Sequence, residues 1–237
     1  MTDLPPFPGF RPEAFQFLRD LAHHNEREWF KPRKATFDDE LLWPARCLVA
    51  DLSRRGPSAG LPLSGDPKRN VFRIYRDTRF SKNKAPYKTH VGLYVTRSGD
   101  KKDEGGLYVH VAPDGMASYD QAGPFVSGGF WSPDRDRLRA LREHMAARPG
   151  AFLAAKAEVE DAGLVVDGRD PLKRMPRGFE THAESEVADA LRWRGFTVTQ
   201  PLTEADLQTP DFTERALAIG RAMLPLLRWG WDATDDR

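Results

Sequence analysis

The first 60 residues carry a helical pattern of hydrophobic positions. Phe15, Leu18 and Leu21 follow one another at three-residue steps and form one apolar stripe. Pro12 stands in front of them, and proline is favoured in the first turn of a helix. These residues predict an amphipathic helix near the start of the chain.

A second, longer helix is predicted to begin near Pro32. Its apolar stripe consists of Phe37, Leu41, Leu48 and Leu52. Pro44 lies inside this helix, and because proline has no backbone N–H, a kink is expected there. Residues 55–67 contain three prolines and three glycines and predict the loop that follows.

From residue 71 onward the pattern changes to the alternation of β-strands. Strand-forming residues dominate four successive runs, at 71–75, 91–96, 107–111 and 116–119. Pro113, Asp114 and Gly115 form a turn signal between the third and the fourth run. The runs predict an antiparallel meander, and the glycine-bearing stretch 123–129 predicts a loop after it.

Helical signals return after this loop. Ser132 is predicted to be the N-cap of a helix with Pro133 at its first position, and the apolar face of that helix includes Leu138 and Leu141. Another helix is expected to follow Pro149.

The last 45 residues predict a strand and a closing helix. The strand is expected at 196–200, and Thr203 after it resembles a helix start. Thr209 is predicted to cap the final helix, whose apolar stripe consists of Phe212, Ala216, Ile219, Met223 and Leu227. Because strands are grouped rather than alternating with helices, we expect an α+β fold. An antiparallel sheet should pack against N-terminal and C-terminal helices in a single domain, residues 1–237.

Composition narrows the class of protein. The chain is 40% hydrophobic and 30% charged, and its 14 Phe, 6 Trp and 5 Tyr are too many for a disordered chain. No run of 18 apolar residues is present to span a bilayer. The single cysteine, Cys47, excludes an intrachain disulfide and a cysteine-rich zinc site. The first residues lack the features of a signal peptide, so we expect a cytosolic protein without a membrane partner.

Positive charge is concentrated in one short segment. The stretch from Lys68 to His90 contains one acid, Asp77, and eight basic residues, which give it a net charge of +7: Lys68, Arg69, Arg73, Arg76, Arg79, Lys82, Lys84 and Lys88. Like charges this close repel one another unless an anion, a carboxylate or solvent separates them. One interpretation is a solvated basic loop that forms ion pairs with acids elsewhere in the chain. The other interpretation is a site for an anion.

Aromatic residues interleaved with the cations favour the anion site. Guanidinium groups offer paired donors that match phosphate or carboxylate oxygens, and lysines add charge. Asp77 is expected to orient one of the arginines, while Tyr75, Phe80 and Tyr87 are candidates to stack on a ligand or to wall a cavity. The candidate ligand-binding residues of this segment are Arg73, Arg76, Asp77, Arg79, Lys82, Lys84, Tyr87 and Lys88.

The two central strand runs place polar aromatic residues on one face. Because successive strand residues alternate faces, His90 and Tyr94 share a face in the first run, as do Tyr108 and His110 in the second. If the runs pair as a hairpin, these side chains form one surface next to the basic segment. His90, His110 and Tyr108 are therefore the candidate catalytic residues. A structural role for each histidine stays open.

Other segments add weaker signals. Gly128 and Gly129 precede the helix predicted at Ser132, whose free N–H groups would favour an anion. Arg174 and Arg177 lie around a predicted turn and add cations to the candidate binding residues.

Familiar catalytic motifs are missing from the sequence. It contains no G-x-S-x-G elbow, no H-E-x-x-H helix, no dinucleotide fingerprint and no P-loop. A metal site built from His90, His110 and a carboxylate such as Asp120 is conceivable, but its ligand spacing is not diagnostic, and no metal is assigned.

The motifs described so far resemble those of one family. The cation-rich run 72–90 resembles the hallmark of the domain of unknown function 2461 family, an uncharacterised microbial family. Further similar stretches follow in the family's order at 25–30, 107–110, 128–131 and 174–179. The resemblance covers nearly the whole chain and implies a single-domain cytosolic protein. It carries over no catalytic residue.

Three functions remain as hypotheses. The first is a basic cavity for a small phosphate- or carboxylate-bearing ligand, where hydrolysis or transfer would use the arginines to hold the anion and a histidine to move a proton. The second is a nucleic-acid-binding module that uses the same cations and aromatic residues. The third is a structural or partner-binding protein. The sequence names no cofactor and no oligomeric state.

Overall fold

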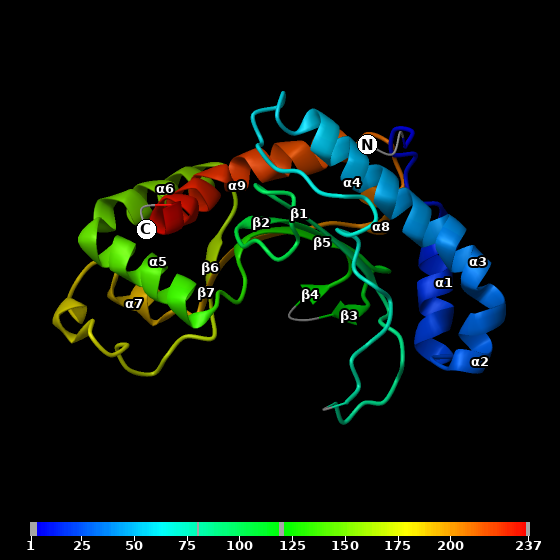
Figure 1. Cartoon of the computed structure of the whole chain (residues 1–237), viewed down its shortest axis with the longest axis horizontal. Helices are drawn as coiled ribbons and strands as arrows, with labels where there is room; N and C mark the ends of the chain where they lie inside the picture. The colour runs from blue at the N-terminus through cyan, green and yellow to red at the C-terminus, as the bar shows by residue number, and fades with distance from the viewer. Residues whose placement is uncertain (1–3, 80, 119–120, 236–237) are drawn as a thin grey trace. The chain divides into compact units, whose positions relative to one another are not determined.

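The computed structural model describes residues 4–79, 81–118 and 121–235. The fold combines helices with antiparallel strands, as the α+β prediction requires (Figure 1). The helices are α1 Pro12–His23, α2 Arg27–Phe30, α3 Lys34–Phe37, α4 Trp43–Arg55, α5 Arg135–Ala147, α6 Pro149–Asp161, α7 Ala188–Arg192, α8 Glu204–Leu207 and α9 Phe212–Asp235. The strands are β1 Val91–Thr96, β2 Gly106–Val111, β3 Ala117–Ser118, β4 Gln121–Ala122, β5 Phe125–Phe130, β6 Val166–Arg169 and β7 Gly195–Pro201.

Five strands form the main sheet in the order β1-β2-β5-β7-β6, and β3 pairs with β4 in a separate two-stranded sheet. The expected meander therefore holds for β1 and β2, which are consecutive and adjacent. The predicted run 116–119 is not the next strand of the main sheet, because its described part forms β3.

None of the helices in the described part of the chain combines the length and the apolar character that crossing a bilayer requires.

The structure divides into two compact units, each assembled from three segments. The first consists of Met1–Lys101, Tyr108–Val126 and Pro201–Leu217, and the second of Lys102–Leu107, Ser127–Gln200 and Ala218–Arg237. The expectation of a single domain stays a prediction.

The apolar stripe predicted for the first helix is buried in the first unit. Phe15, Leu18 and Leu21 of α1 have no exposed surface. The segment before α1 reaches the same core. There the backbone N–H of Phe7 donates to the buried Asp51 carboxylate at 2.8 Å. Removing these apolar side chains from water favours the folding of this core.

The second predicted helix is present as a series of helical segments. Its stripe is buried as expected, but a π-helical turn at Asp38–Leu42 separates α3 from α4. Pro44 stands in the first turn of α4, directly after this turn. Pro44 cannot donate a backbone hydrogen bond, and the widened π-helical turn lies directly before it. The kink expected at Pro44 stays a prediction.

Residues 71–75 do not form the regular strand that the sequence predicts. They make isolated bridges instead, Val71 with Leu93 and Tyr75 with Tyr87. The segment changes its partner midway: it first pairs with β1 and then with the returning chain at residues 86–88. Because Pro86 has no N–H to donate, a continuous ladder cannot form along this pairing.

The stretch 123–129 is not a loop, because most of it belongs to β5, whose six residues are all buried. Two glycines of β5, Gly128 and Gly129, lie so close to neighbouring atoms that a side chain at either position would require those atoms to shift. A Cβ on Gly128 would lie 2.8 Å from Met223 Sδ, and a Cβ on Gly129 would lie 2.2 Å from the Phe196 carbonyl oxygen. Gly129 also has a φ of +121°, which L side chains rarely adopt.

The helix predicted after Ser132 is present as α5, but its N-cap lies two residues further along the chain than predicted. Asp134 is the N-cap of α5, and its carboxylate accepts hydrogen bonds from the N–H groups of Asp136 and Arg137. The helix after Pro149 and the strand at 196–200 are confirmed as α6 and β7. The sequence did not indicate β6, a short strand that pairs antiparallel with β7.

Of the two caps predicted near the C-terminus, the one at Thr203 is confirmed, whereas α9 begins two residues later than a cap at Thr209 requires. Thr203 caps α8 in a capping box with Asp206. The closing helix α9 begins at Phe212, and the N–H of Phe212 donates to the carbonyl of Thr209. Its predicted stripe is buried except at Ile219, which is half-buried.

Candidate functional site

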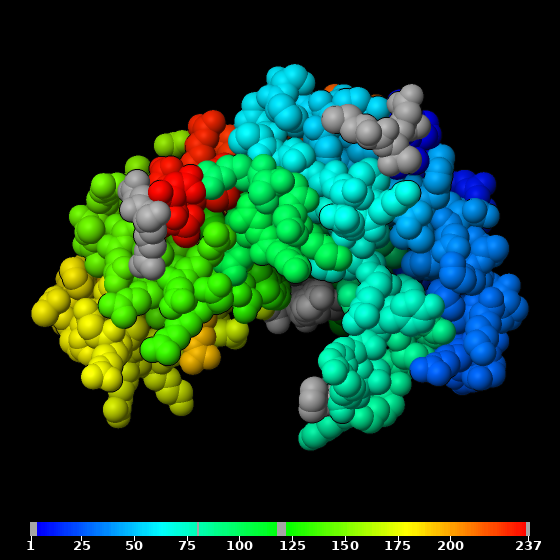
Figure 2. Space-filling model, in the orientation of Figure 1, coloured from blue at the N-terminus to red at the C-terminus, as the bar shows by residue number. Residues whose placement is uncertain are grey.

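A cavity of about 520 Å³ opens in the first unit beside the cation-rich segment. Residues 71–90 leave the sheet as a long excursion and return to it (Figure 1), and this teal segment stands out in the space-filling view (Figure 2). The cavity is lined by Ala22, Asn25, Arg76, Asp77, Asn83, Ala85, Tyr87, Lys88, Thr89, His90 and Ala117. Most of these residues come from the excursion.

Only part of the predicted set lines this cavity. Arg76, Asp77, Tyr87, Lys88 and His90 are brought together in its wall. The other cations proposed for binding are exposed on the excursion outside the lining: Arg73, Arg79, Lys82 and Lys84. Four more candidates belong to the second unit: Gly128, Gly129, Arg174 and Arg177. Phe80 lies outside the described residues.

The carboxylate of Asp77 is already engaged by the protein. Its oxygens accept hydrogen bonds from Arg79 Nε at 3.0 Å and from the Arg79 terminal nitrogen at 2.7 Å. The side-chain hydrogen bond from Arg79 is the main reason that the pKa of Asp77 is lowered. Asp77 therefore orients one arginine, as expected, and that arginine is Arg79.

Two cations in the cavity wall lack such a partner. The half-buried side chain of Arg76 forms no hydrogen bond or ion pair with another part of the chain that the structure describes. The Lys88 ammonium lies 5.6 Å from the centre of the Phe72 ring, and Lys101 lies 5.8 Å from the same ring. Burial lowers the pKa of Lys88, and the positive charges of Arg73 and Lys101 lower it further. Among the described residues of the wall, the positive charges of Arg76 and Lys88 are therefore not paired with a carboxylate.

The predicted shared face of the two histidines is confirmed. The ring centroids of His90 and His110 are 4.3 Å apart, and the Tyr108 hydroxyl lies 3.0 Å from His110 Nδ1. His90 faces the cavity, whereas His110 is fully buried and stacks on Phe125 with a centroid separation of 4.5 Å. The aliphatic residues of both strands occupy the opposite, buried face, as their alternation predicts.

Both histidines are neutral at pH 7. Burial lowers the pKa of His90 to about 4, with a smaller contribution from Lys88. Burial also lowers the pKa of His110 to about 3, and His90 adds to the shift. In this state His90 can offer a neutral ring nitrogen to a ligand, but it is not an imidazolium acid.

Tyr87 and Asn25 hold the excursion to the N-terminal helices. The Asn25 side-chain amide donates to the Tyr87 carbonyl at 3.0 Å and accepts from the Tyr87 N–H at 3.0 Å. The Tyr87 ring stacks on Phe30 at 4.2 Å, and burial is the main cause of its raised pKa. Tyr87 is thus mainly structural, and the role of Asn25 could not be read from sequence because its partner is 62 residues away.

Replacing Asn25 by alanine is expected to destabilise the first unit by about 1–3 kcal/mol, because two hydrogen bonds are lost and the Tyr87 backbone is left without partners. Urea unfolding measures the change. The control Gln16→Ala removes an exposed side-chain hydrogen bond to Asp20 and should change stability by at most about 0.5 kcal/mol. Equal effects of the two variants would contradict the assigned role of Asn25.

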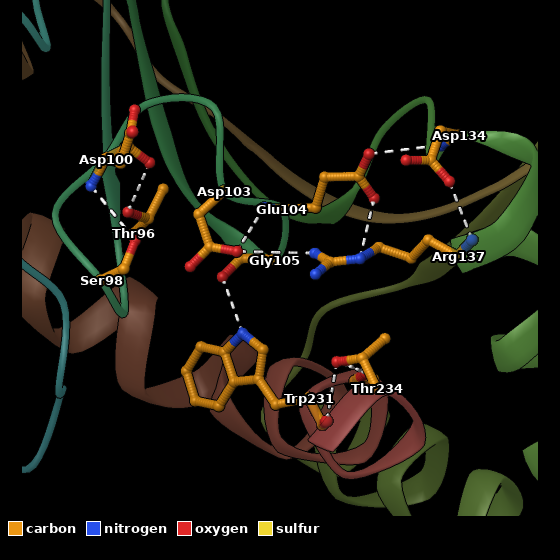
Figure 3. Close-up of polar contacts among 11 residues, drawn as sticks. Thr96, Ser98, Asp100, Asp103, Glu104, Gly105, Asp134, Arg137, Trp231 and Thr234 are labelled. Atoms are coloured by element: carbon orange, nitrogen blue, oxygen red, sulfur yellow. Dashed lines mark hydrogen bonds and ion pairs between the residues drawn. The ribbon is translucent and has the colours of Figure 1, made fainter. Parts of the chain in front are cut away.

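In the second unit, the N-terminus of α5 is filled by the protein's own carboxylates (Figure 3). Asp134 caps the helix, and Glu104 Oε1 accepts from the Asp134 N–H at 3.3 Å. Arg137 lies 3.6 Å from a carboxylate oxygen of Asp103 and 3.6 Å from one of Glu104. Burial is the main cause of the raised pKa of Glu104. The protein's own acidic cap therefore lies at the helix terminus where an anion was expected, and Gly128 and Gly129 are packed inside β5, so the structure gives no support to an anion site here.

The cavity lining that contains Arg177 includes neither Arg174 nor the glycines Gly128 and Gly129 among the described residues. Arg177 lines a separate cavity of about 380 Å³ in the second unit, next to Arg139, Glu143 and His182. Arg139 is paired there with Glu143 at 2.7 Å, while Arg174 is exposed outside this lining.

The family model described as Conserved hypothetical protein (DUF2461) matches residues 13–229. The chain belongs to this family. The DUF2461 match includes every residue that lines the cavity of the first unit. No curated protein and no solved structure gives a significant match to the chain.

A metal site in this DUF2461 chain would combine His90, His110 and a carboxylate such as Asp120. Asp120 lies outside the described residues. Elsewhere, in the part of the chain that the structure describes, no group of three or more His, Cys, Asp or Glu side chains is arranged to hold a metal ion.

Proposed function

We propose that this DUF2461 protein binds a small phosphate- or carboxylate-bearing ligand in the cavity of its first unit. One observation carries the proposal. Arg76 and Lys88 line the same cavity, while Asp77, the carboxylate among the described lining residues, is neutralised by Arg79. A bound anion would offset the burial, and the smaller repulsion from Arg73 and Lys101, that together lower the pKa of Lys88. A guanidinium group can also hold two oxygens of one phosphate or carboxylate at once.

Hydrolysis or transfer at the anionic centre is a further part of this proposal. With a pKa of about 4, His90 is a weak base in the free protein. An anion bound beside it would favour its protonated form and raise that pKa towards neutrality. His90 would then gain the ability to move a proton only when the ligand is present. A cytosolic location is expected for the same protein.

Nucleic-acid binding is the second candidate, and the exposed side of the excursion favours it. Tyr75 is 50% exposed, and four cations surround it in sequence without lining the cavity: Arg73, Arg79, Lys82 and Lys84. An exposed ring between cations can stack on a base while the cations neutralise phosphates.

Calorimetric titration with inorganic phosphate and with a single-stranded oligonucleotide distinguishes these candidates. We expect Arg76→Gln and Lys88→Met each to weaken phosphate binding roughly 10- to 100-fold, because each removes a charge-assisted hydrogen bond. The matched controls Arg69→Gln and Lys84→Met remove exposed cations outside the lining and should leave phosphate affinity unchanged.

Different results would identify the alternatives. Binding of the oligonucleotide that falls steeply with salt, and that suffers equally from the cavity and control variants, would favour the nucleic-acid module. A structural role would appear as a lower melting temperature of Arg76→Gln together with no ligand that raises the melting temperature of the wild type.

A further inference from the structure

The proposed function leaves the chemical class of the ligand open, and the lining of the cavity narrows it. We infer that the ligand is a compact dianion on a hydroxyl-bearing aliphatic skeleton, such as the phosphomonoester of a sugar or polyol or a hydroxy-dicarboxylate. The inference rests on the proposed anion site and adds the charge, size and skeleton of what the site holds.

The charge of the wall calls for a dianion. Arg76 and Lys88 contribute one positive charge each, and the Asp77 charge is balanced by Arg79 outside the lining. A phosphomonoester carries between about −1.5 and −2 at neutral pH, which matches this surplus, whereas a phosphodiester or a monocarboxylate carries only one charge.

The polar atoms that remain available are mainly donors. The Asn25 amide is engaged with the Tyr87 backbone, and Asn83 Oδ1 accepts from the Ala85 N–H at 2.9 Å, which leaves the Asn83 amide N–H groups for a ligand. Arg76 and Lys88 donate only. A donor-rich wall is satisfied by a ligand with many acceptor oxygens.

One hydroxyl completes this wall. Thr89 lines the cavity, and its side chain forms no hydrogen bond with other described residues. A threonine hydroxyl both donates and accepts, so it can pair with a ligand hydroxyl, which also does both. Thr89 and the Asn83 amide thus supply contacts for a hydroxylated skeleton beside the cations.

The cavity offers little surface for a nucleobase. Among the described lining residues, the rings are those of Tyr87, which is 3% exposed and stacked on Phe30, and of His90, which faces His110 at 4.3 Å. The other described lining residues add only small apolar groups, such as the methyls of Ala22, Ala85 and Ala117. Bases are usually held by stacking on free aromatic faces, so a compact non-aromatic skeleton fits better than a nucleotide.

Calorimetry on the full chain at about pH 8, where phosphomonoesters are fully dianionic, tests each part of the inference. The ligands are inorganic phosphate, methyl phosphate, dimethyl phosphate, ribose 5-phosphate, AMP, malate and succinate. We expect methyl phosphate to bind at least about tenfold more tightly than the singly charged dimethyl phosphate, because one charge-assisted contact is worth about that much. Ribose 5-phosphate should bind at least as tightly as AMP, which carries the same phosphate with a base attached. Whether malate or ribose 5-phosphate binds more tightly distinguishes the two sources of a hydroxylated dianion.

A threonine variant tests the hydroxyl contact. Thr89→Val keeps the size of the side chain and should weaken ribose 5-phosphate or malate about five- to tenfold while leaving methyl phosphate and succinate unchanged. The melting temperature of Thr89→Val shows whether this variant folds. If it does not fold, the comparison of ligands on the wild type still tests the inference.

The outcomes separate this inference from the proposed function. AMP binding more than tenfold tighter than ribose 5-phosphate, or dimethyl phosphate binding as well as methyl phosphate, would overturn the compact dianion and leave the anion site standing. No binding of any of these anions would overturn both.

Discussion

Acidification from pH 7 to pH 4 is expected to destabilise the first unit by about 3 kcal/mol for each of two histidines that folding desolvates, His90 and His110. Their pKa values of about 4 and about 3 in the folded protein lie below the ordinary histidine value of 6.5. The unfolded chain therefore takes up protons first as the pH falls below about 6.5. Stability is full above that pH and is lost progressively towards the folded pKa values.

Urea unfolding between pH 7 and pH 4, followed by circular dichroism, measures this loss. Because acidic side chains titrate in the same range, the informative quantity is the difference in slope between the wild type and variants. His110→Gln and His90→Gln should each flatten the pH dependence by about 3 kcal/mol over this interval. His23→Gln, an exposed histidine at the end of α1, is the matched control.

Two results would contradict the expectation. One is a pH dependence of stability in His90→Gln equal to that of the wild type. The other is a change in this pH dependence that is no larger in His90→Gln than in His23→Gln. Because His90 is partly exposed, we expect it to tolerate substitution better than the fully buried His110, so the test remains valid if His110→Gln does not fold.

Replacing Gly129 by alanine is expected to cost at least about 4 kcal/mol, enough to prevent folding of the second unit. Its Cβ would lie 2.2 Å from the Phe196 carbonyl oxygen, which is backbone and cannot turn away as a side chain can. The residue would also have to adopt a φ of +121°. Steric overlap with a neighbouring strand and backbone strain therefore act together.

Two other glycines separate these effects. Gly178 has a φ of +89° and open space around its Cβ position, so Gly178→Ala reports the backbone strain alone, about 1–2 kcal/mol. Gly128→Ala meets the flexible Met223 side chain and should cost about 1–3 kcal/mol. Thermal and urea unfolding of the three variants give the comparison. A Gly129→Ala protein as stable as Gly178→Ala would show that β5 can move away from Phe196.

Much of the secondary structure could be predicted from local signals. Helix α1 follows from an apolar stripe behind a proline, and α8 follows from a threonine cap. These signals depend on residues within one or two turns of each other, so they do not need the rest of the fold. The strand β5 was missed for the opposite reason: its glycines resemble a loop locally, and their purpose appears only when Phe196 and Met223 lie against them.

The candidate site was predicted in part. Strand alternation placed His90, Tyr108 and His110 on one face, and the structure agrees because the alternation of a strand is local geometry. The cations of the excursion were predicted as one group, but only Arg76 and Lys88 reach the cavity, since the path of an irregular segment depends on distant contacts such as Asn25 with Tyr87.

The amino-acid sequence alone therefore established the α+β class, the main helices, the shared face of the histidines and the concentration of positive charge in residues 68–90. The folded arrangement established which of those charges share a cavity, which carboxylate neutralises Arg79, and how far burial lowers the histidine pKa values. The division has a physical reason. Periodicity and charge composition are properties of neighbouring residues, whereas desolvation and ion pairing depend on groups that only folding brings within a few ångströms of each other.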